Sequence, residues 1–292
     1  MDFVHEPQRT YTVGLAQSTV FQGDAEQLLS ILPSNFFRCC VTSPPYWGLR
    51  DYEAEGQIGA ETDPRDYVER LVAVFEQVRR VLSDDGTFWL NIGDGYTSGN
   101  RGYRAPDKKN PIRAMSYRAR TPEGLKPKDL VGIPWRLAFA LQEAGWYLRS
   151  EIIWEKPNCM PESVKDRPTR CHEHVFLFSK SLRYHYDYRS VLEENDRNRR
   201  TVWSIPTEPF PGAHFATFPP KLVEPCILAG SKPGDWVLDP FFGAGTVGVV
   251  CEEQHRRYVG IELNPEYVKL AVERIRRTER WLFASDLKTA RS

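Results

Sequence analysis

Two consecutive prolines placed directly after an apolar run constrain the fold of this 292-residue chain more than any other feature. The run Phe36–Val41 has the length and character of a buried strand, and Pro44 and Pro45 end it because proline cannot donate to a strand ladder. The hexapeptide 42–47 (TSPPYW) is therefore expected at the carboxyl end of a strand. Open α/β sheets keep their functional groups at that edge.

The chemistry of this turn suits a planar group that carries an NH2. Fixed φ angles at Pro44 and Pro45 give a stiff turn whose carbonyl oxygens can accept hydrogen bonds beside the Ser43 hydroxyl. Tyr46 and Trp47 add flat apolar faces. On its own, the same turn is equally compatible with a structural role at the end of a strand.

A second motif lies far downstream, where the apolar residues 237–238 run into a glycine turn and then into a helical pattern. Gly243, Gly245 and Gly248 satisfy the spacing of a dinucleotide fingerprint. Glu262, at the end of the next predicted strand 258–261, stands where a ribose-binding carboxylate is expected. The glycine spacing alone therefore admits a nicotinamide-dependent enzyme.

TSPPYW at 42–47 and DPFFGAGT at 239–246 together resemble the amino-methyltransferases of DNA, which transfer a methyl group from S-adenosylmethionine to an exocyclic amine. The order, with the catalytic motif first and the cofactor motif last, is similar to the β class of that family. The resemblance covers about residues 20–277. It implies a doubly wound, mostly parallel α/β sheet of the S-adenosylmethionine-dependent type, with an antiparallel late hairpin and a small target-recognition insert.

Asp239 separates this family from the nicotinamide enzymes. A carboxylate at the end of the strand would face the pyrophosphate that a helix N-terminus binds, and two negative groups repel each other there. S-adenosylmethionine carries an ammonium and a sulfonium and no phosphate, so an acid at this position favours it.

The resemblance assigns catalysis to Ser43, Pro44, Pro45 and Tyr46. The lone pair of an exocyclic base amine is delocalised into the ring, so acceptors are needed to draw it out of conjugation. We expect the Ser43 hydroxyl and the Pro44 carbonyl to accept from the amine while Tyr46 stacks on a base flipped out of the duplex. Neither a covalent intermediate nor a metal is required.

The resemblance also implies a set of cofactor contacts. Glu262 would accept from the ribose hydroxyls, Phe241 would pack on the cofactor, and Asp24 would contact the adenine as well as begin a helix. The segment around Phe218 would close over the cofactor. The expected cofactor-binding residues are Asp24, Thr217, Phe218, Asp239, Phe241, Gly243, Gly245, Thr246 and Glu262.

Composition agrees with one large intracellular α/β domain. The chain is 41% hydrophobic and has six cysteines without a C-x-x-C pair, which predicts reduced thiols, a cytoplasmic protein and no zinc site. No apolar run approaches membrane-spanning length. We predict a single domain over residues 1–292, with a catalytic half at about 19–179 and a cofactor half at about 214–277.

Two irregular stretches interrupt the pattern of strands and helices. Residues 96–128 hold nine Lys or Arg against Asp107 and Glu123, which indicates either a solvated insert or a clamp for DNA phosphates; beside a base-modifying centre the clamp is favoured. Residues 180–213 occupy the place of the family's target-recognition region. The residues expected to contact DNA are Trp47, Arg101, Arg104, Lys108, Lys109, Arg113, Arg118, Arg197, Arg199 and Arg200.

The target base is predicted from Ser43. Adenine-modifying relatives usually carry Asp or Asn at this position, and Ser resembles the cytosine-N4 subgroup. The alternatives are an adenine-N6 enzyme and, from another class, a DNA-binding module of this fold without turnover. Double-stranded DNA is the expected partner, together with a possible restriction endonuclease for the same site, and the chain is expected to be a monomer or homodimer.

Overall fold

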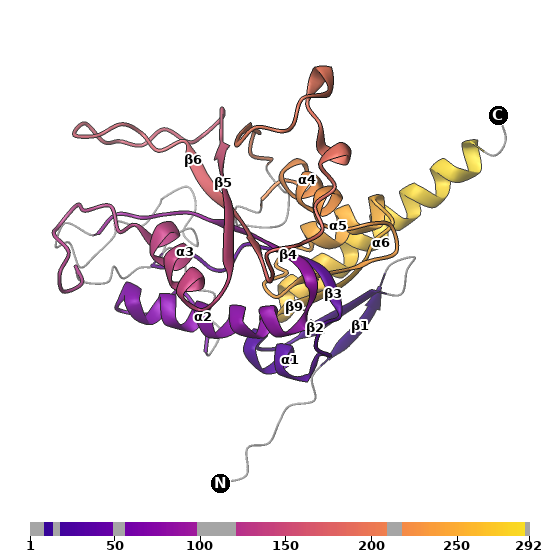
Figure 1. The fold of residues 1–292 in the computed structure, drawn as a ribbon, viewed down its shortest axis with the longest axis horizontal. Helices are drawn as coiled ribbons and strands as arrows, with labels where there is room; N and C mark the ends of the chain where they lie inside the picture. Colours follow the sequence, from indigo (N-terminus) through magenta and orange to yellow (C-terminus); the bar gives the residue numbers. More distant parts are fainter. Residues whose placement is uncertain (1–8, 14–17, 49–55, 98–120, 209–217, 290–292) are drawn as a thin grey trace, which may run out of the picture.

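A computed structural model describes residues 9–13, 18–48, 56–97, 121–208 and 218–289. These residues form a nine-stranded sheet in the order β1-β2-β9-β8-β3-β4-β6-β5-β7, with helices on both faces (Figure 1). The strands are β1 (Thr10–Val13), β2 (Ser18–Gln22), β3 (Phe37–Thr42), β4 (Leu82–Ile92), β5 (Tyr147–Glu155), β6 (His172–Ser179), β7 (Val202–Ser204), β8 (Trp236–Asp239) and β9 (Arg257–Glu262).

The centre of the sheet is parallel. Strands β2, β9, β8, β3 and β4 all run in one direction, so their carboxyl ends lie along one edge. β6 runs antiparallel between β4 and β5, β7 is parallel to β5, and β1 is antiparallel to β2. The expected doubly wound, mostly parallel sheet with an antiparallel late hairpin is confirmed.

Six helices cover the two faces of the described sheet. α1 (Ala25–Ile31), α2 (Pro64–Val81) and α3 (Ile133–Glu143) pack on one face, and α4 (Pro220–Gly230), α5 (Thr246–Glu253) and α6 (Pro265–Thr289) pack on the other. Each face has its own apolar core. One holds Phe37, Phe75 and Phe88, and the other holds Trp89 and Tyr258.

Local sequence signals explain where the first helices begin. Asp24 accepts from the backbone N–H of Gln27 at 3.0 Å and is the N-cap of α1, as predicted. Asp63 caps α2 by accepting from the Arg65 N–H at 2.8 Å, and a proline follows it at the first helical position. The buried face of α2 carries apolar residues at helical spacing, among them Leu71, Val74, Phe75 and Val78.

The structure differs from the sequence-based expectation in two strands. Residues 10–13 form an edge strand, where weak periodicity predicts only a lead-in arm. β4 begins at Leu82 rather than Thr87, because Phe37 pairs with Leu82 and Cys39 with Thr87, which leaves an irregularity between them. A shift of this kind has no local sequence signature, since the neighbouring strand supplies the partners.

Residues 180–208 add little regular structure to the sheet. They contain two 3-10 turns, η1 (Tyr188–Val191) and η2 (Glu194–Asp196), and then the short strand β7. The segment leads from the late hairpin towards α4 (Figure 1), and its strand β7 pairs with β5 at the edge of the sheet. Within the described ranges, none of the helices combines the length and apolar character that crossing a membrane requires.

Candidate active site

The two sequence motifs meet at the carboxyl edge of the sheet. β3 ends at Thr42 and lies directly beside β8, which ends at Asp239. The Thr42 hydroxyl donates to Asp239 Oδ1 at 2.6 Å, across a sequence separation of 197 residues. The diproline turn and the glycine turn therefore open on the same side of the molecule, as the paired motifs predict.

Asp239 is buried, with 1% of its surface exposed. Its Oδ1 accepts from Thr42 and from the Phe241 N–H at 3.0 Å, while Oδ2 is buried and has no hydrogen-bond partner in the described structure. Burial raises the pKa of this carboxyl from 3.8 to about 7, and the two hydrogen bonds oppose that change. A cation placed at Oδ2 would satisfy the oxygen and restore its charge.

Two further acids lie at the ends of the next strands. Glu262 ends β9 and accepts from the Gly243 N–H at 2.7 Å and from the Asn264 N–H at 2.8 Å. Burial raises its pKa from 4.5 to about 7. Asp24 follows β2, and the Gly23 N–H donates to the Glu262 carbonyl at 2.9 Å. Asp24, Glu262 and Asp239 thus lie at the ends of three adjacent strands, β2, β9 and β8.

The glycine turn divides into two parts with different roles. Gly243 has a positive φ of 49°, and a Cβ there would meet only the Phe241 carbonyl oxygen at 3.9 Å, so this backbone is open to a ligand. At Gly245, with φ of 75°, a Cβ would lie 2.9 Å from the Cβ of Ala271. Gly245 is therefore explained by the packing of α5 on α6.

The other residues predicted to bind the cofactor have different surroundings, and one of them lies outside the described residues. Phe241 is partly buried, and its ring lies edge to face with that of Phe75, with 6.3 Å between the ring centroids. Thr246 is 4% exposed, and its hydroxyl accepts from Arg274 at 2.9 Å. Phe218 lies next to the catalytic strand end, whereas Thr217 lies outside the described residues.

The catalytic turn is held by several hydrogen bonds. The Tyr67 hydroxyl donates to the Pro45 carbonyl at 2.8 Å, and the Tyr46 hydroxyl donates to Glu173 Oε2 at 2.6 Å. The Ser43 hydroxyl lies 3.4 Å from the Tyr46 oxygen and keeps its lone pairs for a further donor. No described residue donates to the Pro44 carbonyl. Both predicted acceptors are therefore available.

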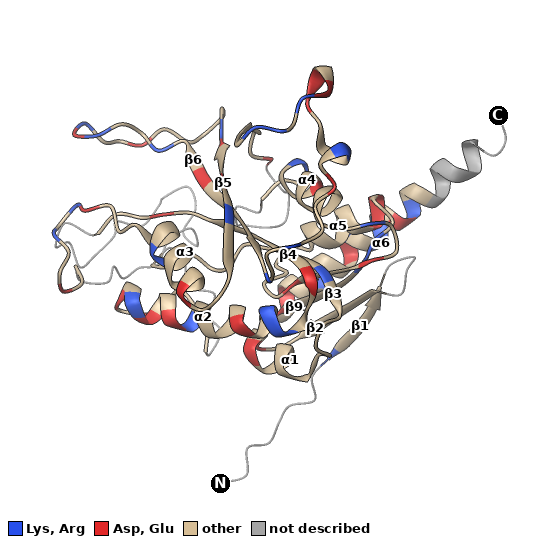
Figure 2. Ribbon diagram, viewed as in Figure 1, with Lys and Arg blue, Asp and Glu red and all other residues tan. Residues whose placement is uncertain are grey.

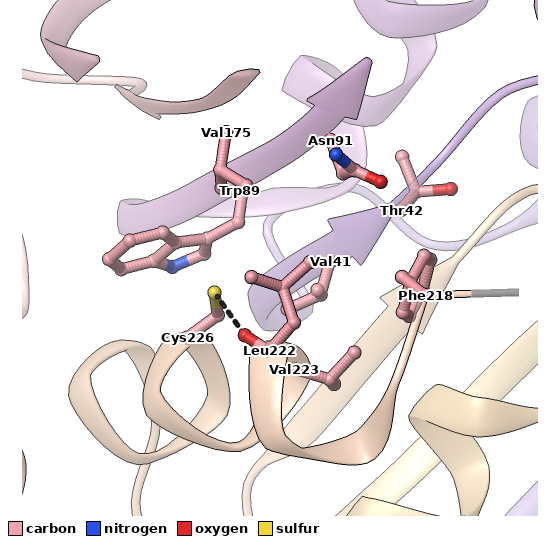
Figure 3. A pocket seen from close by; sticks show the side chains of 9 residues that line it. All are labelled: Val41, Thr42, Trp89, Asn91, Val175, Phe218, Leu222, Val223 and Cys226. Atoms are coloured by element: carbon pink, nitrogen blue, oxygen red, sulfur yellow. Dashed lines mark hydrogen bonds between the residues drawn. The ribbon is translucent and has the colours of Figure 1, made fainter. Parts of the chain in front are cut away.

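A small pocket adjoins this turn. It lies between α4 and the strands β3, β4 and β6 (Figure 3). Its walls are mainly apolar. The polar lining residues include Thr42, which directly precedes the catalytic turn, and Asn91. The pocket-lining residues are Val41, Thr42, Trp89, Asn91, Val175, Phe218, Leu222, Val223 and Cys226.

Asn91 and Glu173 were not predicted as site residues, yet both bond to the Tyr46 hydroxyl of the catalytic turn. A polar Asn91 within an otherwise apolar strand was the available signal for one of them. Glu173 had no comparable signal in the sequence. His174, next to it, bonds to Glu151 at 2.6 Å.

The residues predicted to bind DNA fall into two groups. Arg101, Arg104, Lys108, Lys109, Arg113 and Arg118 lie outside the described residues. Arg197 is exposed, Arg199 lies over the Trp203 ring at 4.6 Å, and Arg200 pairs with Glu193 at 2.9 Å. The Trp47 ring N–H donates to the Glu61 carbonyl at 2.8 Å, so that edge faces the protein.

Along the extended loops that the structure describes, basic and acidic residues both occur (Figure 2). Arg167 bonds to Glu162, and Lys128 pairs with Asp166 at 2.7 Å. The described loops therefore do not provide the excess positive charge that the sequence assigns to residues 96–128.

A parallel sheet whose carboxyl edge carries a diproline acceptor turn beside a buried acid and a glycine turn is the arrangement of an amino-methyltransferase. A family model described as DNA methylase, of the N6/N4 methyltransferase type, matches residues 37–273. The chain belongs to this family of DNA methyltransferases.

Curated relatives match nearly the whole chain. The Type II methyltransferase M.Cfr9I of Citrobacter freundii is 65% identical over 276 residues, which cover 93% of this chain and 92% of that protein. The Type II methyltransferase M.SmaI of Serratia marcescens is 59% identical, with 95% and 97% covered. The chain is therefore a Type II DNA methyltransferase.

Solved structures agree on the fold. The cytosine-N4-specific PvuII DNA methyltransferase has a TM-score of 0.68 at 22% identity, covering 93% of this chain and 95% of that one. A DNA modification methylase of Thermus thermophilus, in complex with S-adenosylmethionine, has a TM-score of 0.64 at 26% identity, covering 88% and 92%. S-adenosylmethionine is the cofactor, and the nicotinamide alternative is excluded.

The residues present fit this cofactor. The unpaired buried Oδ2 of Asp239 suits a cationic group, and Gly243 leaves the turn open beside it. Glu262 accepts from the Gly243 and Asn264 N–H groups and can accept a hydroxyl on its remaining lone pairs.

Proposed function

We propose that this enzyme methylates N4 of cytosine in double-stranded DNA. One observation carries the choice of base: Ser43 occupies the acceptor position, followed by a Pro44 carbonyl to which no described residue donates. A neutral hydroxyl in place of a carboxylate or amide distinguishes this turn from that of adenine-modifying relatives.

The acceptor turn activates the amine. We assign the Ser43 hydroxyl oxygen and the Pro44 carbonyl as acceptors for the two N–H groups, which draws the nitrogen lone pair out of the ring. Because the diproline turn is rigid, these acceptors need little reorganisation when charge develops on nitrogen. Tyr46 is assigned to pack on the flipped base, and the energy of packing offsets a few kcal/mol of unstacking.

The strand-end acids bind and orient the cofactor, which supplies an activated methyl group when bound. Asp239 is assigned to the ammonium, Glu262 to the ribose hydroxyls and Asp24 to the adenine. Phe241 and the segment 217–218 would pack on the cofactor, with Gly243 providing the close backbone approach. Gly245 and Thr246 would act indirectly, by holding the turn against α6.

We assign the recognition of DNA to the two inserts. The basic residues of 96–128 would bind phosphates, which positions the duplex without reading its sequence, and 180–213 would read base edges. A restriction endonuclease acting on the same DNA site would be the functional partner.

The test of the target base uses isotope-labelled S-adenosylmethionine and duplex DNA of mixed sequence. After digestion to nucleosides, mass spectrometry should find labelled N4-methyldeoxycytidine. Labelled N6-methyldeoxyadenosine without the cytosine product would show that the enzyme is instead adenine-specific. Transfer to no nucleoside at all would contradict the assignment of the turn as a catalytic centre.

A matched variant tests the acceptor itself. Ser43→Ala should lower kcat about 100-fold while the affinity for S-adenosylmethionine stays unchanged, because Ser43 faces the base and not the cofactor acids. Equal losses of turnover and of cofactor affinity would show that Ser43 contributes to cofactor binding, which contradicts its assignment to the base.

A further inference from the structure

Glu173 lies beneath the catalytic turn and receives hydrogen bonds from three different elements. The Tyr46 hydroxyl donates to Oε2 at 2.6 Å, and the Asn91 side-chain amide donates to the same oxygen at 3.2 Å. Lys156, just after β5, donates to Oε1. The side chains of Glu173 and Lys156 are each 16% exposed.

Both oxygens of this carboxylate accept hydrogen bonds from protein partners. Oε1 accepts from an ammonium and Oε2 accepts from a phenol and an amide, so each oxygen is already engaged. Lys156 is fixed in turn, because its ammonium lies 4.1 Å from the centre of the Trp154 ring. A carboxylate with its oxygens occupied and its charge compensated is suited to holding another group in place and not to accepting a proton from substrate.

The Tyr46 ring is confined at both ends. At the ring edge, a Cβ added to Gly93 would lie 2.6 Å from Tyr46 Cε2, so the ring packs directly on that backbone. At the other end, Glu173 binds the hydroxyl. Burial, and then the charge of Glu173, raise the pKa of Tyr46 well above its usual value, so the phenol keeps its proton and remains a donor.

We propose that Glu173, neutralised by Lys156, is a positioning residue that fixes the plane of the Tyr46 ring and through it the Ser43 hydroxyl. The Ser43 hydroxyl lies 3.4 Å from the Tyr46 oxygen, so a rotation of the ring would displace the stacking face and remove the group against which the Ser43 hydroxyl is oriented. The inference rests on the proposed base-gripping role of the turn. It does not depend on which amine is methylated.

The test is a double-variant cycle of Glu173→Gln and Tyr46→Phe, with total methyl transfer to duplex DNA as the readout. Each substitution alone should lower kcat about tenfold, since small misplacements of reacting groups have effects of that order or larger. In the Tyr46→Phe background, Glu173→Gln should have no further effect, because the bond through which it acts is already absent. The dissociation constant for S-adenosylmethionine should change less than about twofold in all variants.

Glu151→Gln is the matched control. Glu151 is a partly buried carboxylate in the same hairpin and bonds to a neighbouring side chain, His174, at 2.6 Å, but it does not contact the turn. Its kcat should stay within about twofold of the parent enzyme. Should Glu173→Gln fail to fold, Glu173→Asp keeps the charge beside Lys156 while shortening the reach to Tyr46, and it should show the same tenfold loss.

Two outcomes would overturn the inference. One is a multiplicative loss in the double variant, which would show that Glu173 acts independently of Tyr46. The other is unchanged kcat in Glu173→Gln and Glu173→Asp. A parent enzyme that transfers no methyl group to any DNA would instead contradict the proposed function, so the two failures are distinguishable.

Discussion

Asp239 combines a binding function with a cost in stability. It is buried beside Thr42, and one of its oxygens has no partner among the described residues. Its pKa of about 7 in the folded protein exceeds the ordinary value of 3.8, so between those pH values the folded state binds more protons than the unfolded state. Ionised Asp239 therefore destabilises the free protein, and this effect grows as pH rises from about 4 to about 7.

Asp239→Asn should separate these two properties. The amide keeps an oxygen for the Thr42 and Phe241 donors but loses the charge, so the free energy of unfolding at pH 8 should rise by roughly 1–3 kcal/mol, with little change at pH 4. Affinity for S-adenosylmethionine should fall at least about 100-fold. Denaturant unfolding at both pH values and calorimetric titration measure the two effects. A variant that binds the cofactor like the parent would contradict the assignment of Asp239 to the ammonium.

Gly93 tests the geometry of the catalytic turn from the opposite side. Gly93→Ala would place a methyl group 2.6 Å from Tyr46 Cε2, so Tyr46 must move and kcat should fall about tenfold or more with cofactor affinity retained. Gly95→Ala is the control, because a Cβ there meets nothing within 4 Å. Comparable kinetics in both variants would show that the Tyr46 ring position does not matter for turnover.

At the scale of elements, α3 depends on a distant residue for its start. Its N-cap, Gly132, has no side chain to accept from the first turn, and Asp94 at the end of β4 takes that role. Asp94 Oδ1 accepts from the Gly132 N–H at 2.9 Å and the Ile133 N–H at 3.1 Å. Arg170 lies 3.5 Å from the same carboxylate. A single side chain thus joins a strand end, a helix and the loop before β6.

Asp94→Ala should lower the free energy of unfolding by about 2 kcal/mol, because it removes a helix cap and leaves buried N–H groups unpaired. Asp84→Ala is the comparison: Asp84 is 81% exposed and pairs with Lys180 at 3.1 Å, so its loss should matter by less than about 1 kcal/mol. Urea denaturation of both variants measures the difference. Equal stabilities would mean that α3 begins without help from Asp94.

At the scale of the whole molecule, the sheet interleaves the two halves of the chain. Strands β8 and β9 come from the cofactor half, yet they lie between β2 and β3 of the catalytic half. The catalytic half therefore has no continuous sheet of its own, and its strand β3 has β8 as one of its two neighbours.

A fragment of residues 1–208 should consequently fail to fold cooperatively, because β2 and β3 lose the strands that join them. We expect a broad thermal transition by circular dichroism and rapid proteolysis, compared with a single sharp transition in the whole chain. A fragment with a sharp transition of its own would contradict the single-domain interpretation and divide the chain into two folding units.

The sequence predicted those parts of the site that depend on the conformational preferences of neighbouring residues. Proline fixes φ and removes a donor, glycine permits positive φ, and an aspartate at a strand end caps a helix; each effect acts within a few residues. These effects predicted the diproline turn, the glycine turn at Gly243 and the cap at Asp24. The family resemblance then predicted that the two turns cooperate.

The sequence by itself determined which segments become strands and turns and which class of chemistry the strand ends carry, because those properties depend on neighbouring residues. Only the tertiary structure decided that β8 lies beside β3, that Glu173 holds Tyr46, that Asp94 caps α3, and that Gly245 serves helix packing. Each of these contacts joins residues far apart in sequence. They form only when two apolar cores bury both faces of one sheet, and that burial depends on the whole chain.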